Sequence, residues 1–212
     1  MSERDSRRPR GGAARPALSL ASGLKAKALY WLARREHSRH ELQTKLRVYM
    51  AQQQRTQQLQ AHTREEDDHT DEVLQAVLND LENANWLSDS RTAEAVVYSR
   101  QQRGLGIRRI TQDLKRKGLD STTITTATAD LQHTEAQRAL ALLQKRKGSL
   151  SNLESEDEEN QPSLSSSSAL QARQKAWQKH YQFLVRRGFS GDVAQRALRL
   201  WASDAFDDAR HE

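Results

Sequence analysis

The chain has 212 residues, of which only 35% are hydrophobic, and it carries a net charge of +6 and no Cys. The lack of Cys excludes a disulfide scaffold, a thiolate metal site and a Cys nucleophile. No apolar run approaches the roughly eighteen residues that cross a bilayer, so we expect a cytoplasmic protein without membrane contact. The 26 Leu outnumber the 3 Ile and 7 Val, a composition that suits helices better than strands. We therefore predict an all-α protein.

Positive charge is concentrated in three parts of the chain. Residues 25–50 carry seven Lys or Arg against two acidic residues, and residues 100–118 and 173–199 each carry seven against one. Acidic residues gather instead at 65–72 and 154–159. This separation favours a polyanionic partner. The alternative is that Lys and Arg only solvate exposed helix faces.

The first folded segment is preceded by an arginine-rich stretch. Residues 1–22 carry five Arg among Pro and Gly without an apolar period, which predicts a flexible basic arm. Residues 23–87 are predicted to form a first three-helix repeat, whose second helix begins with a capping box from Ser38 to Glu41. A Gln-rich and acidic stretch at about 50–70 has no apolar stripe, so it is either an exposed insertion or a helix extension.

An apolar pattern marks the third helix of the repeat and then recurs 50 residues later. The first copy is Leu74, Val77, Leu78 and Leu81, and the second is Ile124, Ala127, Thr128 and Leu131. We expect Thr70 to cap the first of these helices and Asp120 or Ser121 to cap the second. The recurrence indicates duplication of one helical unit.

Two further repeats are predicted, over residues 88–132 and 133–203, followed by a tail at 204–212. The third repeat contains a Ser-rich acidic stretch at about 149–170, which is typical of a low-complexity loop. Units of about 45 residues barely outweigh their chain entropy alone, so neighbours must pack together. We predict three tandem helix-turn-helix-like repeats in an elongated curved array.

No enzymatic or cofactor motif is present in the sequence. Gly104 and Gly106 lack the preceding strand and third glycine of a phosphate loop, so we expect a tight turn between helices. His37 and His40 lack the further ligands of a metal site, so we expect exposed histidines. No Ser, His and acid group is fixed by a motif. We predict no enzyme activity and no catalytic, metal or cofactor site.

Aromatic and paired basic residues have alternative interpretations. The four Trp can stack on unpaired bases, but each lies near a helical apolar pattern, which favours core packing: Trp31, Trp86, Trp177 and Trp201. Three arginine pairs are expected at the second helix of each repeat: Arg34 with Arg35, Arg108 with Arg109, and Arg186 with Arg187. Their repetition favours contact with phosphates or acidic protein over simple packing of their stems.

Three stretches together resemble the RecX family of bacterial regulators. They are ALYWLARREHSRHELQTKL at 28–46, LSDSRTAEAVVYSRQQRGLGIRRITQDLKRKGL at 87–119, and FLVRRGFSGDVAQRAL at 183–198. The middle stretch is the most specific, because it combines a Leu-x-Asp turn, an Ala-Glu pair, Arg100, the Gly-x-Gly turn and a closing Lys-Gly in that order. The resemblance implies a helical array that binds in the groove of a RecA filament on single-stranded DNA and restrains recombination.

From this resemblance and the charge pattern we predict a regulator that modulates, and mainly inhibits, the RecA recombinase. We expect it to be a monomer with weak, sequence-independent affinity for single-stranded DNA. The residues predicted to contact the RecA filament or DNA are Arg34, Arg35, Arg100, Arg103, Arg108, Arg109, Lys115, Arg116, Lys117, Arg186 and Arg187. The alternative is a helix-turn-helix transcriptional regulator that reads the major groove of duplex DNA.

Overall fold

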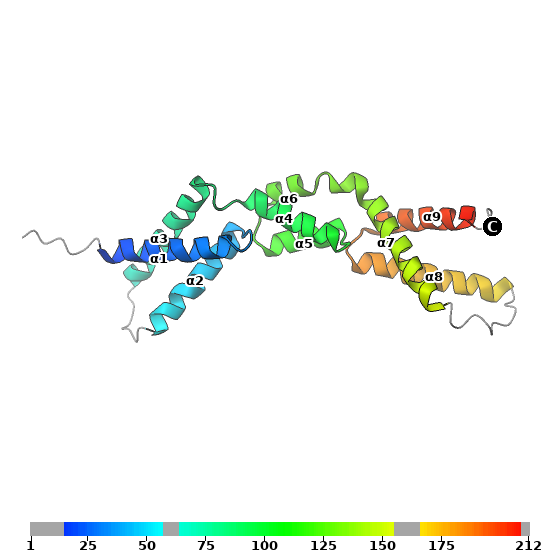
Figure 1. The fold of residues 1–212 in the computed structure, drawn as a ribbon, viewed down its shortest axis with the longest axis horizontal. Coiled ribbons are helices and arrows are strands. Elements are labelled where there is room, and N and C mark those ends of the chain that lie inside the picture. The colour runs from blue at the N-terminus through cyan, green and yellow to red at the C-terminus, as the bar shows by residue number, and fades with distance from the viewer. Residues whose placement is uncertain (1–14, 57–63, 155–165, 209–212) are drawn as a thin grey trace, which may run out of the picture. The chain divides into compact units, whose positions relative to one another are not determined.

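A computed structural model describes residues 15–56, 64–154 and 166–208 of the chain. All regular structure in these ranges is helical (Figure 1), which confirms the predicted all-α class. None of the helices in the described ranges is long and apolar enough to cross a membrane. The contacts divide the chain into two compact units with a boundary between Thr92 and Ala93.

The first unit contains α1 (Arg15–Leu32), α2 (Arg39–Thr56) and α3 (Arg64–Asn83), and each of the three contacts the other two. Its core combines one apolar face of each helix. The four residues predicted to mark the third helix are all buried in this core: Leu74, Val77, Leu78 and Leu81. Ser38 caps α2 as predicted, since its hydroxyl accepts a hydrogen bond from the Glu41 amide at 3.1 Å.

Two predictions for this unit differ from the structure, and a third point, which the sequence left open, is decided by it. Helix α1 begins at Arg15, inside the predicted arm. Helices α2 and α3 extend into the Gln-rich and acidic stretch, so its described part is helix extension, while residues 57–63 lie outside the described ranges. Thr70 therefore lies inside α3, and its predicted role as a cap is wrong. Because Gln, Arg and Glu are good helix formers, a helix continues through them even where the sequence has no apolar stripe to indicate it.

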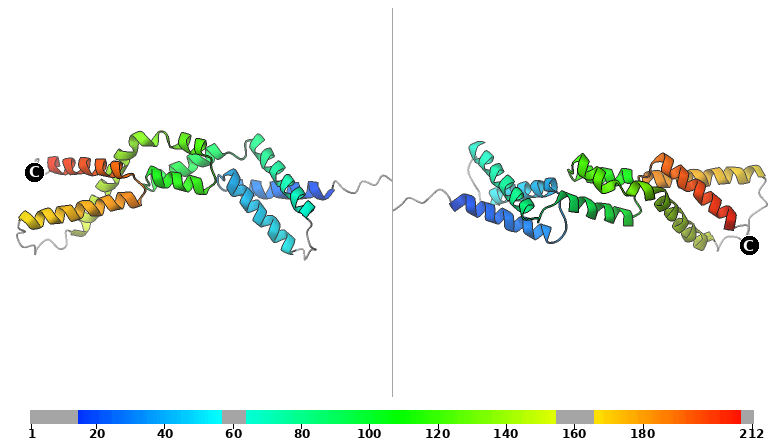
Figure 2. Two further views of the ribbon diagram at one scale, coloured as in Figure 1. Left: turned by 180° about the vertical axis from the view of Figure 1, so that it is seen from behind. Right: turned by 90° about the horizontal axis from the view of Figure 1, so that it is seen from above.

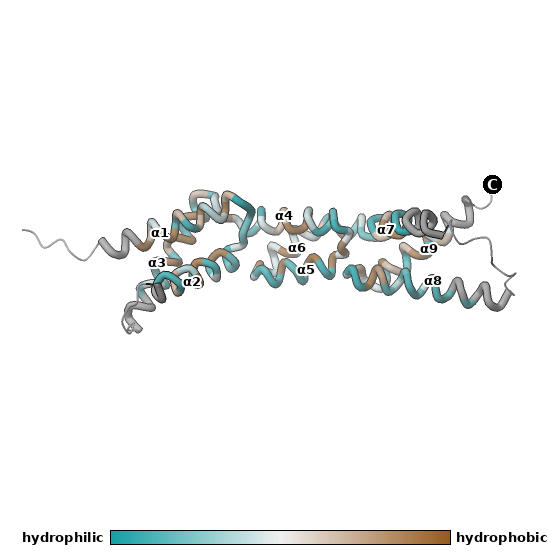
Figure 3. Tube along the Cα trace, turned by 60° about the horizontal axis from the view of Figure 1, so that its bottom comes forward, coloured by the Kyte–Doolittle hydropathy of each residue, from teal (hydrophilic) through white to brown (hydrophobic). Residues whose placement is uncertain are grey.

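The second unit contains the remaining helices, the first of which starts just before the boundary. They are α4 (Asp89–Gln102), α5 (Ile107–Arg116), α6 (Ser121–Thr128), α7 (Leu131–Glu154), α8 (Ser166–Arg186) and α9 (Gly191–Asp208). Helix α9 packs against both α7 and α8 (Figure 2), whereas α5 contacts α6 and α7. Apolar and polar residues alternate along these helices (Figure 3), as expected where one face is buried.

The low-complexity stretch and the tail are shorter than predicted. Helix α7 reaches Glu154 and α8 begins at Ser166, so both ends of the expected loop are helical, and residues 155–165 lie outside the described ranges. Helix α9 likewise continues to Asp208. Leu131 is buried as predicted, but it begins α7 instead of ending the helix before it.

Helix ends in the second unit follow the sequence signals closely. The Asp120 carboxylate accepts a hydrogen bond from the Thr123 amide at 2.8 Å, so Asp120 is the cap of α6. Gly118 follows the end of α5 with φ +74°, a conformation that favours glycine over residues with a side chain. The first feature confirms one of the two caps predicted for this helix, and the second is typical of a glycine that ends a helix.

Two predictions about exposure are wrong. Trp86 has 59% of its surface exposed, because it lies in the turn after α3, beyond the apolar face of that helix. His37 is 1% exposed. Its Nδ1 donates to the Arg35 carbonyl at 2.9 Å, and Lys45 Nζ lies 2.9 Å from its Nε2. Burial lowers the pKa of His37, so the ring is neutral at pH 7. The other three Trp pack partly buried against the cores, as predicted.

Candidate functional site

The turn before α5 is fixed by two side chains of α7. Gly106 has no side chain to cap the helix, and the Glu135 carboxylate instead accepts a hydrogen bond from the Ile107 amide at 2.7 Å. Arg138 Nη1 donates to the Leu105 carbonyl at 3.2 Å. Gly104 has φ +67°, which confirms that the Gly-x-Gly sequence forms a tight turn. The first residue of α5 is thus hydrogen-bonded to a side chain of α7.

The same turn interlocks with the end of α8 through main-chain hydrogen bonds. The Gly106 amide donates to the Arg187 carbonyl at 3.0 Å, and the Arg108 amide donates to the Gly188 carbonyl at 3.1 Å. A Cβ atom on Gly106 would overlap the main chain of Gly188 and Phe189. The two glycines therefore permit the close approach that places α5 beside the end of α8.

One side of α5, which we call its inner side, is organised around Asp113. The Asp113 carboxylate is 8% exposed and accepts hydrogen bonds from Arg100 Nε at 2.7 Å and from Arg116. Arg109 Nε lies 3.7 Å from the same carboxylate. Burial raises the pKa of Asp113, but the hydrogen bonds and charges of Arg100 and Arg116 outweigh it, so the pKa lies below its ordinary value. Three of the predicted contact residues therefore stabilise a buried acid.

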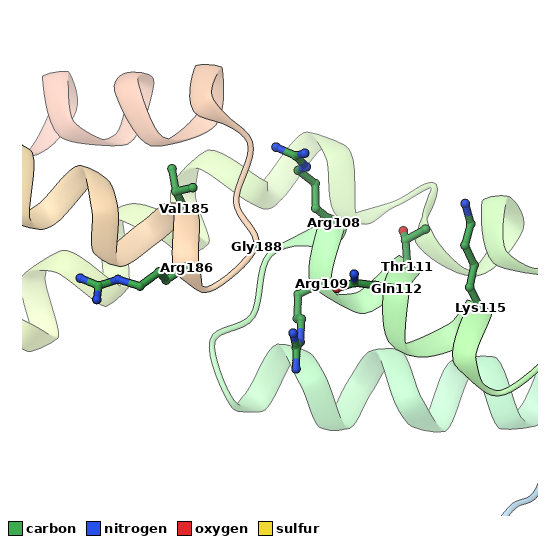
Figure 4. A pocket seen from close by; sticks show the side chains of 8 residues that line it. All are labelled: Arg108, Arg109, Thr111, Gln112, Lys115, Val185, Arg186 and Gly188. Carbon is green, nitrogen blue, oxygen red and sulfur yellow. The ribbon is translucent and has the colours of Figure 1, made fainter.

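The other side of α5, its outer side, carries polar residues one turn apart. A shallow cavity of about 360 Å³ is lined by five residues of α5 and by three at the end of α8, as Figure 4 shows: Arg108, Arg109, Thr111, Gln112, Lys115, Val185, Arg186 and Gly188. Arg108 and Lys115 point to the same side of the helix in this view, and Arg109 points the opposite way. No acidic residue lines this cavity among the residues that the structure describes. We call it the α5–α8 cavity.

The predicted pair in the first unit lies outside the second helix. Arg34 and Arg35 follow the end of α1 and precede α2, so their predicted place on helix two is wrong. Arg34 Nη1 donates to the Tyr30 hydroxyl at 3.0 Å, and Arg35 forms an ion pair with Glu41. A turn residue next to a capping box has acceptors close by, which the spacing of the arginines does not reveal.

The remaining predicted residues surround the end of α8 and the end of α5. Arg186 is exposed in the α5–α8 cavity, and its Nε donates to the Gln182 carbonyl, one turn earlier in α8, at 3.3 Å. Arg187 faces a different cavity, and its Nη1 donates to the Arg103 carbonyl at 2.7 Å. Lys117 is half-buried at the C-terminal cap of α5. The structure thus brings Arg108, Arg109, Lys115 and Arg186 to one cavity, where Arg109 also lies near Asp113, and disperses the other predicted residues.

The α5–α8 cavity offers positive charge from Arg108, Lys115 and Arg186 with no acidic residue among its described lining residues, while its fourth cation, Arg109, lies 3.7 Å from Asp113. Guanidinium and ammonium groups in this setting bind phosphate or carboxylate oxygens by charge-assisted hydrogen bonds. Within the described ranges, no three His, Cys, Asp or Glu side chains lie close enough to hold a metal ion. The chemistry that the described cavity supports is therefore anion binding.

Comparison with known proteins assigns the family. Residues 88–127 match the model of the second three-helix domain of RecX, and residues 165–198 match that of the third. The regulatory protein RecX of Leptothrix cholodnii is 35% identical over 88% of this chain and 91% of its own length. The corresponding protein of Ralstonia pickettii is 37% identical over 82% of this chain and 86% of its own.

A solved structure has the same fold. The crystal structure of RecX from Lactobacillus salivarius superposes with a TM-score of 0.60 at 19% identity, over 87% of this chain and 98% of that one. At this identity the likeness speaks for the fold alone, and the sequence relatives speak for the family. The helical repeats, the two matched domains and these relatives together show that the chain belongs to the RecX family.

Proposed function

We propose that the chain regulates RecA, mainly as an inhibitor, by binding RecA filaments on single-stranded DNA. Membership of a family whose relatives are named regulatory proteins supports a regulatory role. The observation that carries the filament proposal is the α5–α8 cavity, where Arg108, Lys115 and Arg186 lie together with no acidic residue among the described lining residues. A protein filament on DNA exposes phosphates along its groove, and such a surface attracts a cationic cavity.

In the proposed mechanism the regulator acts by binding and catalyses no reaction. A protein that binds one state of a filament shifts the equilibrium among filament states by its difference in affinity for them. We place the chain in the cytoplasm as a monomer, with weak DNA affinity that does not depend on base sequence. Affinity that does not depend on base sequence agrees with a site built from a few cations, because phosphate contacts carry no sequence information.

The proposal is tested by titrating the full chain into RecA that hydrolyses ATP on single-stranded DNA. We expect inhibition at amounts of the chain well below those of RecA. A RecA ATPase rate that does not change over the titration would contradict the proposal.

A second measurement separates this function from transcriptional regulation. Binding to random duplex pools and to single-stranded oligonucleotides should reveal weak affinity with no preferred sequence. A preference for one duplex sequence by orders of magnitude would support a helix-turn-helix transcription factor instead.

A further inference from the structure

A second cavity, of about 690 Å³, lies between the end of α4, α7 and the end of α8. Five cationic side chains line it, and none of its described lining residues is acidic: Arg103, Arg138, Lys145, Arg146 and Arg187. Ala141, Leu142 and Phe183 give it an apolar wall. Its volume lies within the range of sites that hold small ligands. We call it the Phe183 cavity.

Two of the guanidinium groups are held in place by the aromatic ring. The guanidinium carbon of Arg146 lies 4.6 Å from the centroid of Phe183, and that of Arg187 lies 4.8 Å from it. Arg187 is also hydrogen-bonded to the Arg103 carbonyl. Arginines that are stacked and tethered in this way lose less conformational entropy when they bind an anion. Their planar edges suit the paired oxygens of a phosphate.

Arg138 adds a cation that the protein only partly satisfies. Its Nη1 donates to the Leu105 carbonyl, but Nε and Nη2 are buried and find no acceptor among the described residues. Burial lowers the pKa of this guanidinium, and the charge of Glu135 offsets part of that effect. A partly buried cation of this kind raises the positive potential of the cavity, because water screens it less than it screens an exposed one.

The combination of groups in the Phe183 cavity favours one class of ligand. Five cations are more than a single carboxylate neutralises, so the ligand carries several negative charges. The apolar wall and the side-chain amides of Gln101 and Gln102 suit the face and edge of a nucleobase. An acidic peptide would satisfy the cations but would leave the apolar wall without a partner.

We propose that the Phe183 cavity binds nucleotide units through their phosphates and bases. A free nucleotide and a single strand of nucleic acid share this chemistry. This inference rests on the proposed function only in that both include contact with a DNA strand. It assigns the contact to Lys145 and Arg146, which are not among the contact residues predicted from the sequence. It needs no RecA.

The test measures binding of a short dye-labelled oligothymidylate to the full chain by fluorescence anisotropy, without RecA. Replacing both Lys145 and Arg146 with Gln should weaken binding about tenfold near 0.15 M salt and reduce the salt slope by about 1.4, which is roughly 0.7 for each phosphate contact. The control replaces Lys175 and Lys179 with Gln, because these exposed α8 residues carry the same charge and line neither cavity among the described residues. Its affinity should change less than about twofold, since it removes no phosphate contact.

A conservative variant and two competitors sharpen the test. Arg146→Lys keeps the charge but loses the planar fork, so it should weaken binding without changing the salt slope. Competition by ATP indicates that a single nucleotide suffices, and its failure indicates that the ligand is a strand. Equal weakening in both double variants would overturn the proposal, as would competition by polyglutamate as effective as that by unlabelled oligothymidylate. A chain that binds the oligonucleotide but leaves RecA unaffected would refute only the proposed function.

Discussion

On the inner side of α5, Arg109 and Arg116 lie beside the buried Asp113, although Arg109 also reaches the α5–α8 cavity, whereas on the outer side Arg108 and Lys115 line that cavity, which has no acidic residue among its described lining. The four cations belong to one helix of ten residues. The inner cations neutralise a carboxylate that burial would otherwise destabilise. The outer cations do not neutralise this carboxylate, so their charge remains available to bind a partner. A local count of Lys and Arg therefore overstates the binding surface.

The largest effect on stability is expected at Asp113. Replacing Asp113 with Asn removes the charge that Arg100 and Arg116 share, and should lower the free energy of unfolding of the second unit by about 3 kcal/mol. This value is at the low end for a broken buried pair because the side chains of Arg109 and Arg116 are 48% and 64% exposed. Chemical denaturation monitored by circular dichroism measures this loss.

The matched control for this variant is Asp120→Asn. Asn caps a helix as well as Asp does, so this change should leave the denaturation midpoint almost unaltered. Equal destabilisation by the two variants would mean that the Asp113 cluster contributes no special stability.

A smaller loss of stability is expected at Gly106, which allows α5 to lie close to the end of α8. Ala at Gly106 places a Cβ against the main chain of Gly188, and overpacking of this kind costs about 2 kcal/mol. Ala at Gly23, inside α1 with open space around it, should instead raise stability by about 0.5 to 1 kcal/mol. Thermal melts of both variants check the two signs, and a neutral Gly106→Ala variant would argue against the interlock.

Acid titration separates the Asp113 charge from its packing. Its pKa is lowered in the folded state, so its contribution is complete above the ordinary value of 3.8 and is lost as the pH falls through the lower folded value. The stability gap between the wild type and Asp113→Asn should therefore be constant from pH 7 to about pH 5 and narrow below pH 4. A gap that is the same at pH 3 and pH 7 would show that charge has no part in it.

The smallest effect on stability is expected on the outer side of α5. Replacing Arg108 and Lys115 with Gln should change the free energy of unfolding by less than about 0.5 kcal/mol, as is usual for surface positions. The matched inner variant, with Gln at Arg100 and Arg116, should be clearly less stable. Denaturation curves of the two variants that coincide would remove the distinction between the sides.

Much of the fold could be predicted from the sequence, because its signals are local. The capping residues Ser38 and Asp120, the helix stop at Gly118 and the apolar periods all act within one or two turns. The sequence left open whether the Gln-rich stretch extends a helix, and the helix ends at the Ser-rich stretch were missed, since good helix formers continue a helix without any apolar signal.

The site was less predictable because its contacts join residues far apart in the chain. Arg116 lies three residues from Asp113, a spacing that does suggest a pair, but Arg100 reaches the same carboxylate from another helix. Gly188 could be assigned as a helix stop, yet nothing in the sequence connects it with Gly106. The Phe183 cavity likewise forms from three helices whose residues share no motif.

The central claim is that the outer cations of α5, Arg108 and Lys115, contact a polyanionic partner. The most direct test is the RecA ATPase on single-stranded DNA, titrated with the wild type, with the variant that replaces Arg108 and Lys115 by Gln, and with the equally charged control at Lys175 and Lys179. We predict that the outer variant stays folded but requires about tenfold more protein for the same inhibition, from two lost phosphate contacts. Inhibition curves that coincide for all three proteins would contradict the account.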